Sequence, residues 1–130
     1  MDYASQFNRL PWHDSKLLGI QIRRSSEKDS DEVVCDVLLR GEQRGKYNPV
    51  KIEFTDCAVV RLDMDLIGKR MCSDDIAEAA CLSNSELMQR ILSERTKAEQ
   101  NWITGTLHYQ IMLVQPGGTI DIFASGFQIH

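Results

Sequence analysis

The segment WHDS at positions 12–15 carries groups that could do chemistry and stands before the first alternating apolar run of the chain. A histidine beside an aspartate can act as a general base, and a serine can act as a nucleophile. Adjacent side chains of an extended segment point to opposite faces, however, so His13 and Asp14 are poorly placed to orient each other. We therefore interpret the segment as a turn in which Asp14 or Ser15 accepts backbone hydrogen bonds, while Trp12 covers the end of the core.

A second acid–base pair, His108 and Asp121, lies on two alternating runs joined by a tight turn. Facing side chains on paired strands come within ~5 Å, so the two could form a catalytic couple. We interpret them first as a surface histidine–aspartate pair. The alternative is a small enzyme or ligand-binding domain in which His13, Asp14, His108 and Asp121 converge in a pocket between sheet and helix.

The stretch RLDMDL places Arg61, Asp63 and Asp65 on one strand face. Carboxylates two residues apart could share a hard cation, but no EF-hand spacing accompanies them. We interpret them as an exposed face balanced by Arg61, or as an acidic docking stripe.

Motifs for metals and cofactors are absent from the sequence. GGT at 117–119 is too short for a phosphate-binding loop, and GxSxG, HExxH and GxGxxG do not occur. No CxxC pair occurs, so we predict no metal and no cofactor. We expect the cysteines to be reduced and structural, because two of them lie inside apolar strand patterns. The four are Cys35, Cys57, Cys72 and Cys81.

The chain has a net charge of −4, and all of the excess acid lies after residue 50. The excess negative charge repels the phosphate backbone of nucleic acids and disfavours their binding, whereas it favours a basic protein partner. No apolar run approaches the ~20 residues of a membrane span, and the N-terminus lacks the pattern of a signal peptide. We therefore predict a cytoplasmic protein without membrane contact.

The apolar patterns predict the elements that position these residues. Alternation over 16–23, 33–39, 50–55, 58–64, 107–114 and 120–124 predicts strands, with a bulge or bend at 56–57. In the first strand it places Leu18, Ile20 and Ile22 on one face. Residues 76–81 fit either a strand or a helical turn. Pro116 and Gly117 predict a type II turn with positive φ at Gly117.

One helix is predicted over about 84–96, beginning with a capping box formed by Ser83 and Glu86. The short connections favour antiparallel pairing. We therefore predict a single α+β domain over 1–130, with one helix packed on a mostly antiparallel sheet of about six or seven strands. Such a sheet can curl or form a partial barrel.

Three segments together, WHDSKLLGIQI, FTDCAVVRLDMDLIGKR and LHYQIMLVQPGGTIDIFA, resemble small uncharacterised bacterial single-domain proteins. That group is similar to predicted immunity proteins of polymorphic toxin systems. The resemblance spans nearly the whole chain and has WHDS as its one short motif. It implies a mostly β fold that binds a cognate toxin without catalysis.

Our leading hypothesis is therefore a non-catalytic protein-binding module of immunity type, whose partner is a basic toxin domain. Complementary charge would speed association, and a few buried anchors would supply affinity. The candidate anchors are Trp12 and Trp102, and the candidate steering residues are Asp63, Asp65, Asp74 and Asp75. The remaining alternatives are the enzyme described above and an oligomeric scaffold paired through exposed strand edges.

Overall fold

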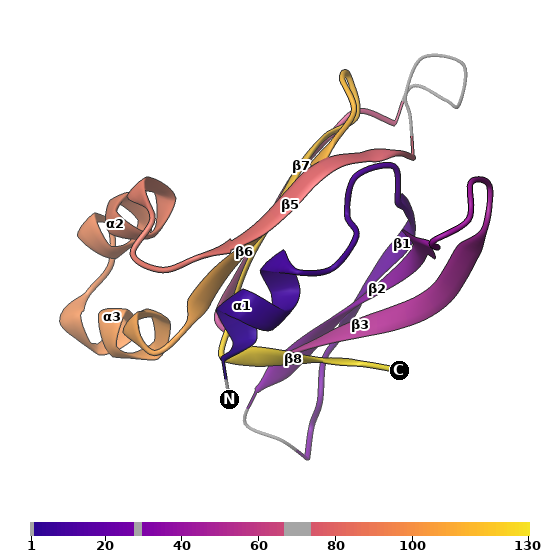
Figure 1. Ribbon diagram of the computed structural model, residues 1–130. Helices are drawn as coiled ribbons and strands as arrows, with labels where there is room; N and C mark the ends of the chain where they lie inside the picture. The colour runs from indigo at the N-terminus through magenta and orange to yellow at the C-terminus, as the bar shows by residue number, and fades with distance from the viewer. Residues whose placement is uncertain (1, 28–29, 67–73) are drawn as a thin grey trace.

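The computed structural model describes residues 2–27, 30–66 and 74–130 and contains two antiparallel sheets of four strands each. Figure 1 shows the two layers. The first sheet has the order β1-β2-β3-β8, formed by Lys16–Arg23, Asp31–Arg40, Tyr47–Cys57 and Gly126–Ile129. The second sheet has the order β4-β7-β6-β5, formed by Val59–Met64, Gly118–Ala124, Leu107–Leu113 and Ile76–Leu82. The helices over the described residues are α1 (Tyr3–Asn8), α2 (Glu86–Ser93) and α3 (Lys97–Thr104). In Figure 1, α2 and α3 lie together on the left and α1 lies apart from them.

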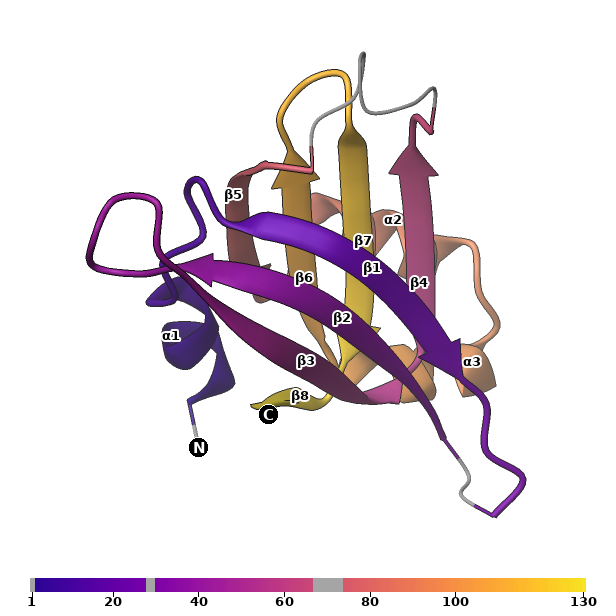
Figure 2. The ribbon, with the colours of Figure 1, turned by 90° about the vertical axis from the view of Figure 1, so that its right-hand side faces the viewer.

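The main core lies between the sheets, whose strands cross obliquely in Figure 2. Alternate residues of each strand face inward because side chains alternate across a strand. The inward residues of the central strands are fully or nearly fully buried: Val33, Cys35, Val37, Ile52, Phe54, Tyr109, Ile111, Ile120 and Ile122. Two sheets packed in this way bury their apolar faces without closing into a barrel.

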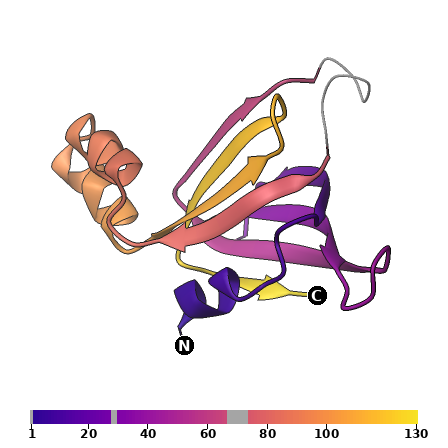
Figure 3. The same ribbon diagram turned by 45° about the horizontal axis from the view of Figure 1, so that its top comes forward.

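A smaller core lies on the other face of the second sheet. Met88 and Ile91 of α2 and Ile103 of α3 pack there against Phe123 of β7. Figure 3 shows α2 and α3 on the far side of the second sheet from the first sheet. The second sheet is therefore apolar on both faces at this end, which explains why β7 is buried over Ile120–Ala124.

The chain passes between the sheets at two corners. Asp56 adopts a positive φ of 52° at the end of β3, and the chain then enters β4 in the other sheet. Ser125 marks the second corner, where its N–H donates to the Thr55 carbonyl at 3.0 Å. The bend predicted at 56–57 is therefore confirmed, and it transfers the strand from one layer to the other.

Two features of the predicted sheet are wrong, its number of strands and layers and the alternation of its first strand, and one open question is resolved. The described residues form eight strands in two sheets, where one sheet of six or seven was expected, and there is no barrel. The ambiguous segment 76–81 belongs to a strand, β5. In β1, a register shift between Leu17 and Gly19 turns Leu17 into the core and leaves Leu18 57% exposed. A bulge of this kind cannot be read from alternation alone.

The predicted single helix is also corrected. The α2 N-cap is Ser85, whose Oγ accepts a hydrogen bond from the Met88 N–H at 3.2 Å, so Ser83 does not cap it. A second helix begins after Thr96, which forms the capping box with Glu99. Residues 84–96 therefore span one helix and the turn to another. The six-residue α1 was not predicted.

The predicted C-terminal hairpin is confirmed as β6 and β7, with Ile111 opposite Ile120. Its turn differs from the prediction. The Gln115–Pro116 peptide bond is cis, and the positive φ falls on Gly118, at 106°. A Cβ built on Gly118 would lie 2.0 Å from the Asp63 carbonyl oxygen, so only glycine fits beside β4.

Candidate functional site

The WHDS segment is a turn whose side chains serve the fold. The Trp12 Nε1 donates to the Phe7 carbonyl at 2.7 Å, and the ring is 4% exposed. The Ser15 hydroxyl is fully buried, where it donates to the Pro11 carbonyl at 2.5 Å and accepts from the Arg40 N–H at 2.8 Å. Trp12 is therefore a core residue and is excluded as a partner anchor.

The four residues of the expected pocket lie in two separate places. His13 and Asp14 contact each other at 3.2 Å with side chains 73% and 65% exposed, and the Asp14 N–H donates to the Ile76 carbonyl at the start of β5. His108 is paired with Leu82, at the other end of β5. Six residues of strand separate these ends by roughly 20 Å, so the four side chains do not share one pocket.

His108 and Asp121 do meet, but inside the protein. His108 is 1% and Asp121 9% exposed, so the expected surface pair is wrong. Asp121 is paired with Gln110, and the His108 Nε2 reaches diagonally to its Oδ1 at 2.6 Å. The imidazole stacks on Phe123 with ring centres 4.5 Å apart. The smaller core therefore covers the pair.

Ser85, which sequence reasoning missed and which is half-buried, extends this pair into a hydrogen-bonded series. The Ser85 Oγ lies 2.7 Å from the His108 Nδ1, so Ser85, His108 and Asp121 form a continuous hydrogen-bonded series. Burial acts to raise the pKa of Asp121, but hydrogen bonds from His108 and from Gln110 (3.0 Å) lower it below its ordinary value. The carboxylate is therefore ionised, and its partners tie the start of α2 to the second sheet.

The predicted steering residues gather at one end of the second sheet, around the β6–β7 turn. The Asp65 N–H donates to the Gly117 carbonyl at 3.3 Å, and the Asp75 carbonyl accepts from Val114 at 2.9 Å. Asp75 also forms an ion pair with Lys16 at 2.6 Å. We call this surface the acidic end, and it consists of Asp63, Asp65, Asp74 and Asp75.

The second predicted anchor, Trp102, lies at the other end of β4. Its side chain is 72% exposed on α3, beside a groove of about 790 Å³ between the helices and the β3–β4 corner. We call this the Trp102 groove; its lining includes Asp31, Asp56, Val59, Arg95, Glu99 and Trp102. Val59 begins β4 and Asp65 follows its end, so roughly 20 Å separates the groove from the acidic end.

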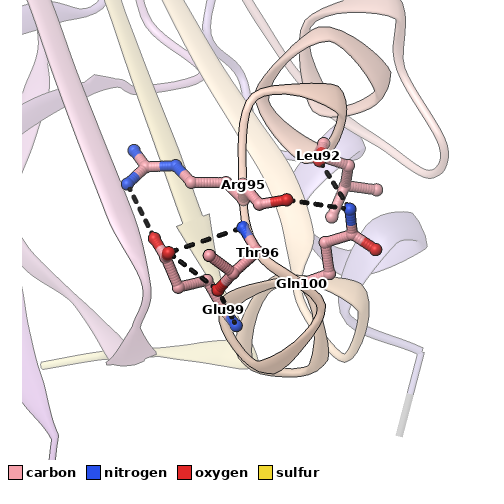
Figure 4. A network of polar contacts seen from close by, with 5 residues as sticks. All are labelled: Leu92, Arg95, Thr96, Glu99 and Gln100. Atoms are coloured by element: carbon pink, nitrogen blue, oxygen red, sulfur yellow. Dashed lines mark hydrogen bonds and ion pairs between the residues drawn. The ribbon is translucent and has the colours of Figure 1, made fainter.

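The helical wall of the Trp102 groove is fixed by the polar network of Figure 4. The Gln100 Nε2 donates to the carbonyls of Leu92 at 2.8 Å and of Arg95 at 3.2 Å, which locks the turn between α2 and α3. Arg95 pairs with Glu99 at 3.3 Å, and Glu99 completes the capping box with Thr96. The exposed indole therefore lies on a helix whose first turn is hydrogen-bonded to the end of α2 and to the turn between the helices.

The described cysteines are free thiols in apolar surroundings. Burial raises the pKa of Cys35 to about 12, and the pKa values of Cys57 and Cys81 to about 11. Thiols with such pKa values are poor nucleophiles at neutral pH, as expected for structural cysteines. Cys72 lies outside the described residues. Among those described, no three potential metal-binding side chains come together.

Comparison with models of known protein families, with curated proteins and with solved structures finds no match. No helix of the described residues has the length and apolar composition needed to cross a bilayer. The interpretation of function therefore depends on the geometry of this chain.

Proposed function

We propose that this chain is a protein-binding module that holds its partner at the Trp102 groove. The observation that carries the proposal is a tryptophan 72% exposed beside a groove of about 790 Å³. Tryptophan dominates the binding energy of many protein interfaces because it buries a large, rigid surface. Here the turn network has fixed its helix before the partner arrives, which lowers the entropy cost of binding.

The charge distribution supports a basic partner. The chain carries −4 overall, and Asp63, Asp65 and Asp74 are exposed at the acidic end. Complementary charge of this kind increases association rates more than affinity. Together with the resemblance described above, it supports an immunity-type protein that neutralises a basic bacterial toxin domain in the cytoplasm.

We expect the gene beside this one to encode a basic toxin domain, and we expect Trp102→Ala to weaken binding to that domain by at least about tenfold, the usual loss at a central anchor. In cells that express the toxin domain, wild-type protein should restore growth and the variant should fail to do so. Leu18→Ala is the matched control, because Leu18 is 57% exposed on β1, away from the Trp102 groove, and should retain full protection. Protection that survives Trp102→Ala would contradict the proposal.

A second candidate function, acyl transfer, is favoured by one observation. Ser85, His108 and Asp121 lie in the hydrogen-bonded order of a nucleophile, a base and its orienting carboxylate. In such a reaction the hydroxyl proton would pass to the His108 Nδ1 as the Ser85 Oγ attacks a carbonyl carbon, and the imidazolium would then give that proton to the leaving group as its bond to the carbon breaks and the carbonyl re-forms. Against this, the same oxygen caps α2 and the imidazole is 1% exposed, which favours a structural role.

A fluorophosphonate probe separates the two functions. The binding proposal predicts no labelling of Ser85 above that of a heat-denatured control, because the oxygen is held by α2 and the base is enclosed. Stoichiometric labelling that is lost in Ser85→Ala and in His108→Gln would establish the acyl-transfer site instead.

A further inference from the structure

The four outer edges of the two sheets are not equally open to pairing. The Asn8 side chain covers the β5 edge by bonding the N–H of Cys81 at 2.7 Å and its carbonyl at 3.3 Å. Ser15 covers the same edge, because its carbonyl accepts a hydrogen bond from the Ile76 N–H at 2.7 Å. The β8 edge is only four residues long, and β1 carries the bulge between Leu17 and Gly19. Short edges and bulges are common ways to prevent unwanted pairing.

The β4 edge has none of these protections over the described residues. Val59–Met64 pairs with β7 in an unbroken register, and no described strand lies on its other side. The strand is exposed at Arg61, Leu62 and Asp63, with Leu62 48% exposed. Unpaired N–H and C=O groups along such an edge can pair with another extended chain.

The sequence of β4 is complementary to itself in one antiparallel register. With Leu62 opposite Leu62 of a second copy, Arg61 faces Asp63 of that copy, and the symmetry repeats the contact. Moving the centre to Arg61 sets two arginines opposite each other, and moving it to Asp63 sets two aspartates opposite each other. Like charges directly opposite are destabilising, so of these three registers charge favours the one centred on Leu62, which is also the register that pairs Arg61 with Asp63.

The apolar residues of β4 agree with this register. Leu62 lies opposite Ile120 and Val60 opposite Ile122 on β7, so both lie on the core-facing side of the second sheet. In the Leu62 register the two Leu62 side chains are neighbours, and Val60 faces Met64 of the other copy. The pairing would cover a leucine that is now half-exposed.

We propose that the β4 edge binds a second copy of this chain, forming a two-fold dimer with antiparallel β4 strands centred on Leu62. The pairing joins the two second sheets into one continuous eight-stranded sheet. Leu62 contacts its own counterpart, and every other contact occurs twice, once on each side of the two-fold axis, as a two-fold interface requires. The dimer does not depend on the proposed function.

The dimer would also change the surface that binds the partner, and this part of the inference rests on the proposed function. Continuing the register by one residue places Asp65 of the second copy opposite Val59, which lines the Trp102 groove. The acidic end of one copy would then border the groove of the other. The anchor and the steering charges, roughly 20 Å apart within one chain, would form one surface.

A charge-swap experiment tests the dimer by sedimentation equilibrium. We expect the wild-type chain to have the mass of a dimer, whereas Asp63→Arg and Arg61→Asp should each be monomeric because like charges then face each other across the two-fold axis. Arg61 also lies opposite Asp121 in its own chain, so far-UV circular dichroism must show that Arg61→Asp is folded. An equimolar mixture of the two variants should recover the dimer mass, since both cross-strand positions again hold opposite charges. Lys51→Glu disturbs a similar cross-strand pair, Lys51–Asp36, on the first sheet and should remain dimeric.

Cysteine cross-linking tests the register and does not require a change of charge. Directly opposite residues of antiparallel strands have Cα atoms about 4.5–5.5 Å apart, within reach of a disulfide. We therefore expect Leu62→Cys to form a covalent dimer on mild oxidation, above the wild-type background. Val60→Cys should not do so, because the two copies of that position lie more than ~7 Å apart. A monomeric wild-type chain, or equal cross-linking by both variants, would overturn the proposal; neither result bears on the toxin-protection assay.

Discussion

Replacing Asp121 with alanine is expected to lower the free energy of unfolding by about 2–4 kcal/mol. The change removes an ionised acceptor and leaves the His108 Nε2 and the Gln110 amide without their partner in the smaller core. Buried polar groups without partners cost far more than an average surface hydrogen bond contributes. Urea denaturation followed by far-UV circular dichroism measures the effect.

Asp63→Ala is the matched control, because Asp63 lies on the neighbouring strand and is exposed. We expect this variant to change the free energy of unfolding by at most about 0.5 kcal/mol, measured at protein concentrations where the wild type and the variant are both monomeric.

The stability of the wild-type protein should also depend on pH. The pKa of Asp121 lies below its ordinary value of 3.8, so its contribution is complete above that value and is lost as the pH falls through the lower pKa. Asp121→Asn should remove this acid-dependent loss. Equal stability of the wild type and Asp121→Ala would contradict the hydrogen bonds described between Asp121 and its partners His108 and Gln110.

Gly118→Ala is expected to lower the free energy of unfolding by about 3 kcal/mol or more. The new Cβ would lie 2.0 Å from the Asp63 carbonyl oxygen, and φ is 106°, a conformation that alanine rarely adopts. Because the obstacle is backbone, relief requires β4 and the β6–β7 turn to separate. Thermal unfolding measured by calorimetry should show a markedly lower Tm.

Gly105→Ala provides the contrast for this prediction. Gly105 has φ of −81°, and a Cβ there would meet nothing within 4 Å. Alanine at such a position restricts the unfolded chain, so the variant should be neutral or slightly more stable. A Gly118→Ala protein as stable as Gly105→Ala would show that β4 does not approach the turn as described.

The sequence predicts the strands well because alternation at a period of two directly reports a half-buried surface. The β6–β7 hairpin and the bend at 56–57 follow from this signal. The division into two sheets does not, because a sequence pattern gives the face of a residue and not the layer to which its strand belongs. Helix α1 was missed because six residues carry little periodicity, and its Phe7 is fixed by contacts with Trp12 and Tyr109 that form only in the fold.

The candidate site, too, could be predicted from the sequence only where it depends on local features. The WHDS turn could be predicted because some of its hydrogen bonds are local, such as the one from the Ser15 hydroxyl to the Pro11 carbonyl, whereas its bond from the Arg40 N–H could not. Trp102 was a candidate anchor by residue type alone. The partnership of Ser85 with His108 spans 23 residues and depends on how α2 meets β6, which no local pattern reports. One signal was available: Ser85 is a good N-cap residue three positions before Met88, in competition with Ser83.

The central claim is that this chain acts by binding a protein at the Trp102 groove. Isothermal titration calorimetry with the purified product of the neighbouring gene, which we expect to carry a basic toxin domain, tests it most directly. We predict saturable binding for the wild-type chain and for Leu18→Ala, with Kd raised at least about tenfold in Trp102→Ala. Absence of heat for the wild-type chain, or an unchanged Kd in Trp102→Ala, would contradict the claim.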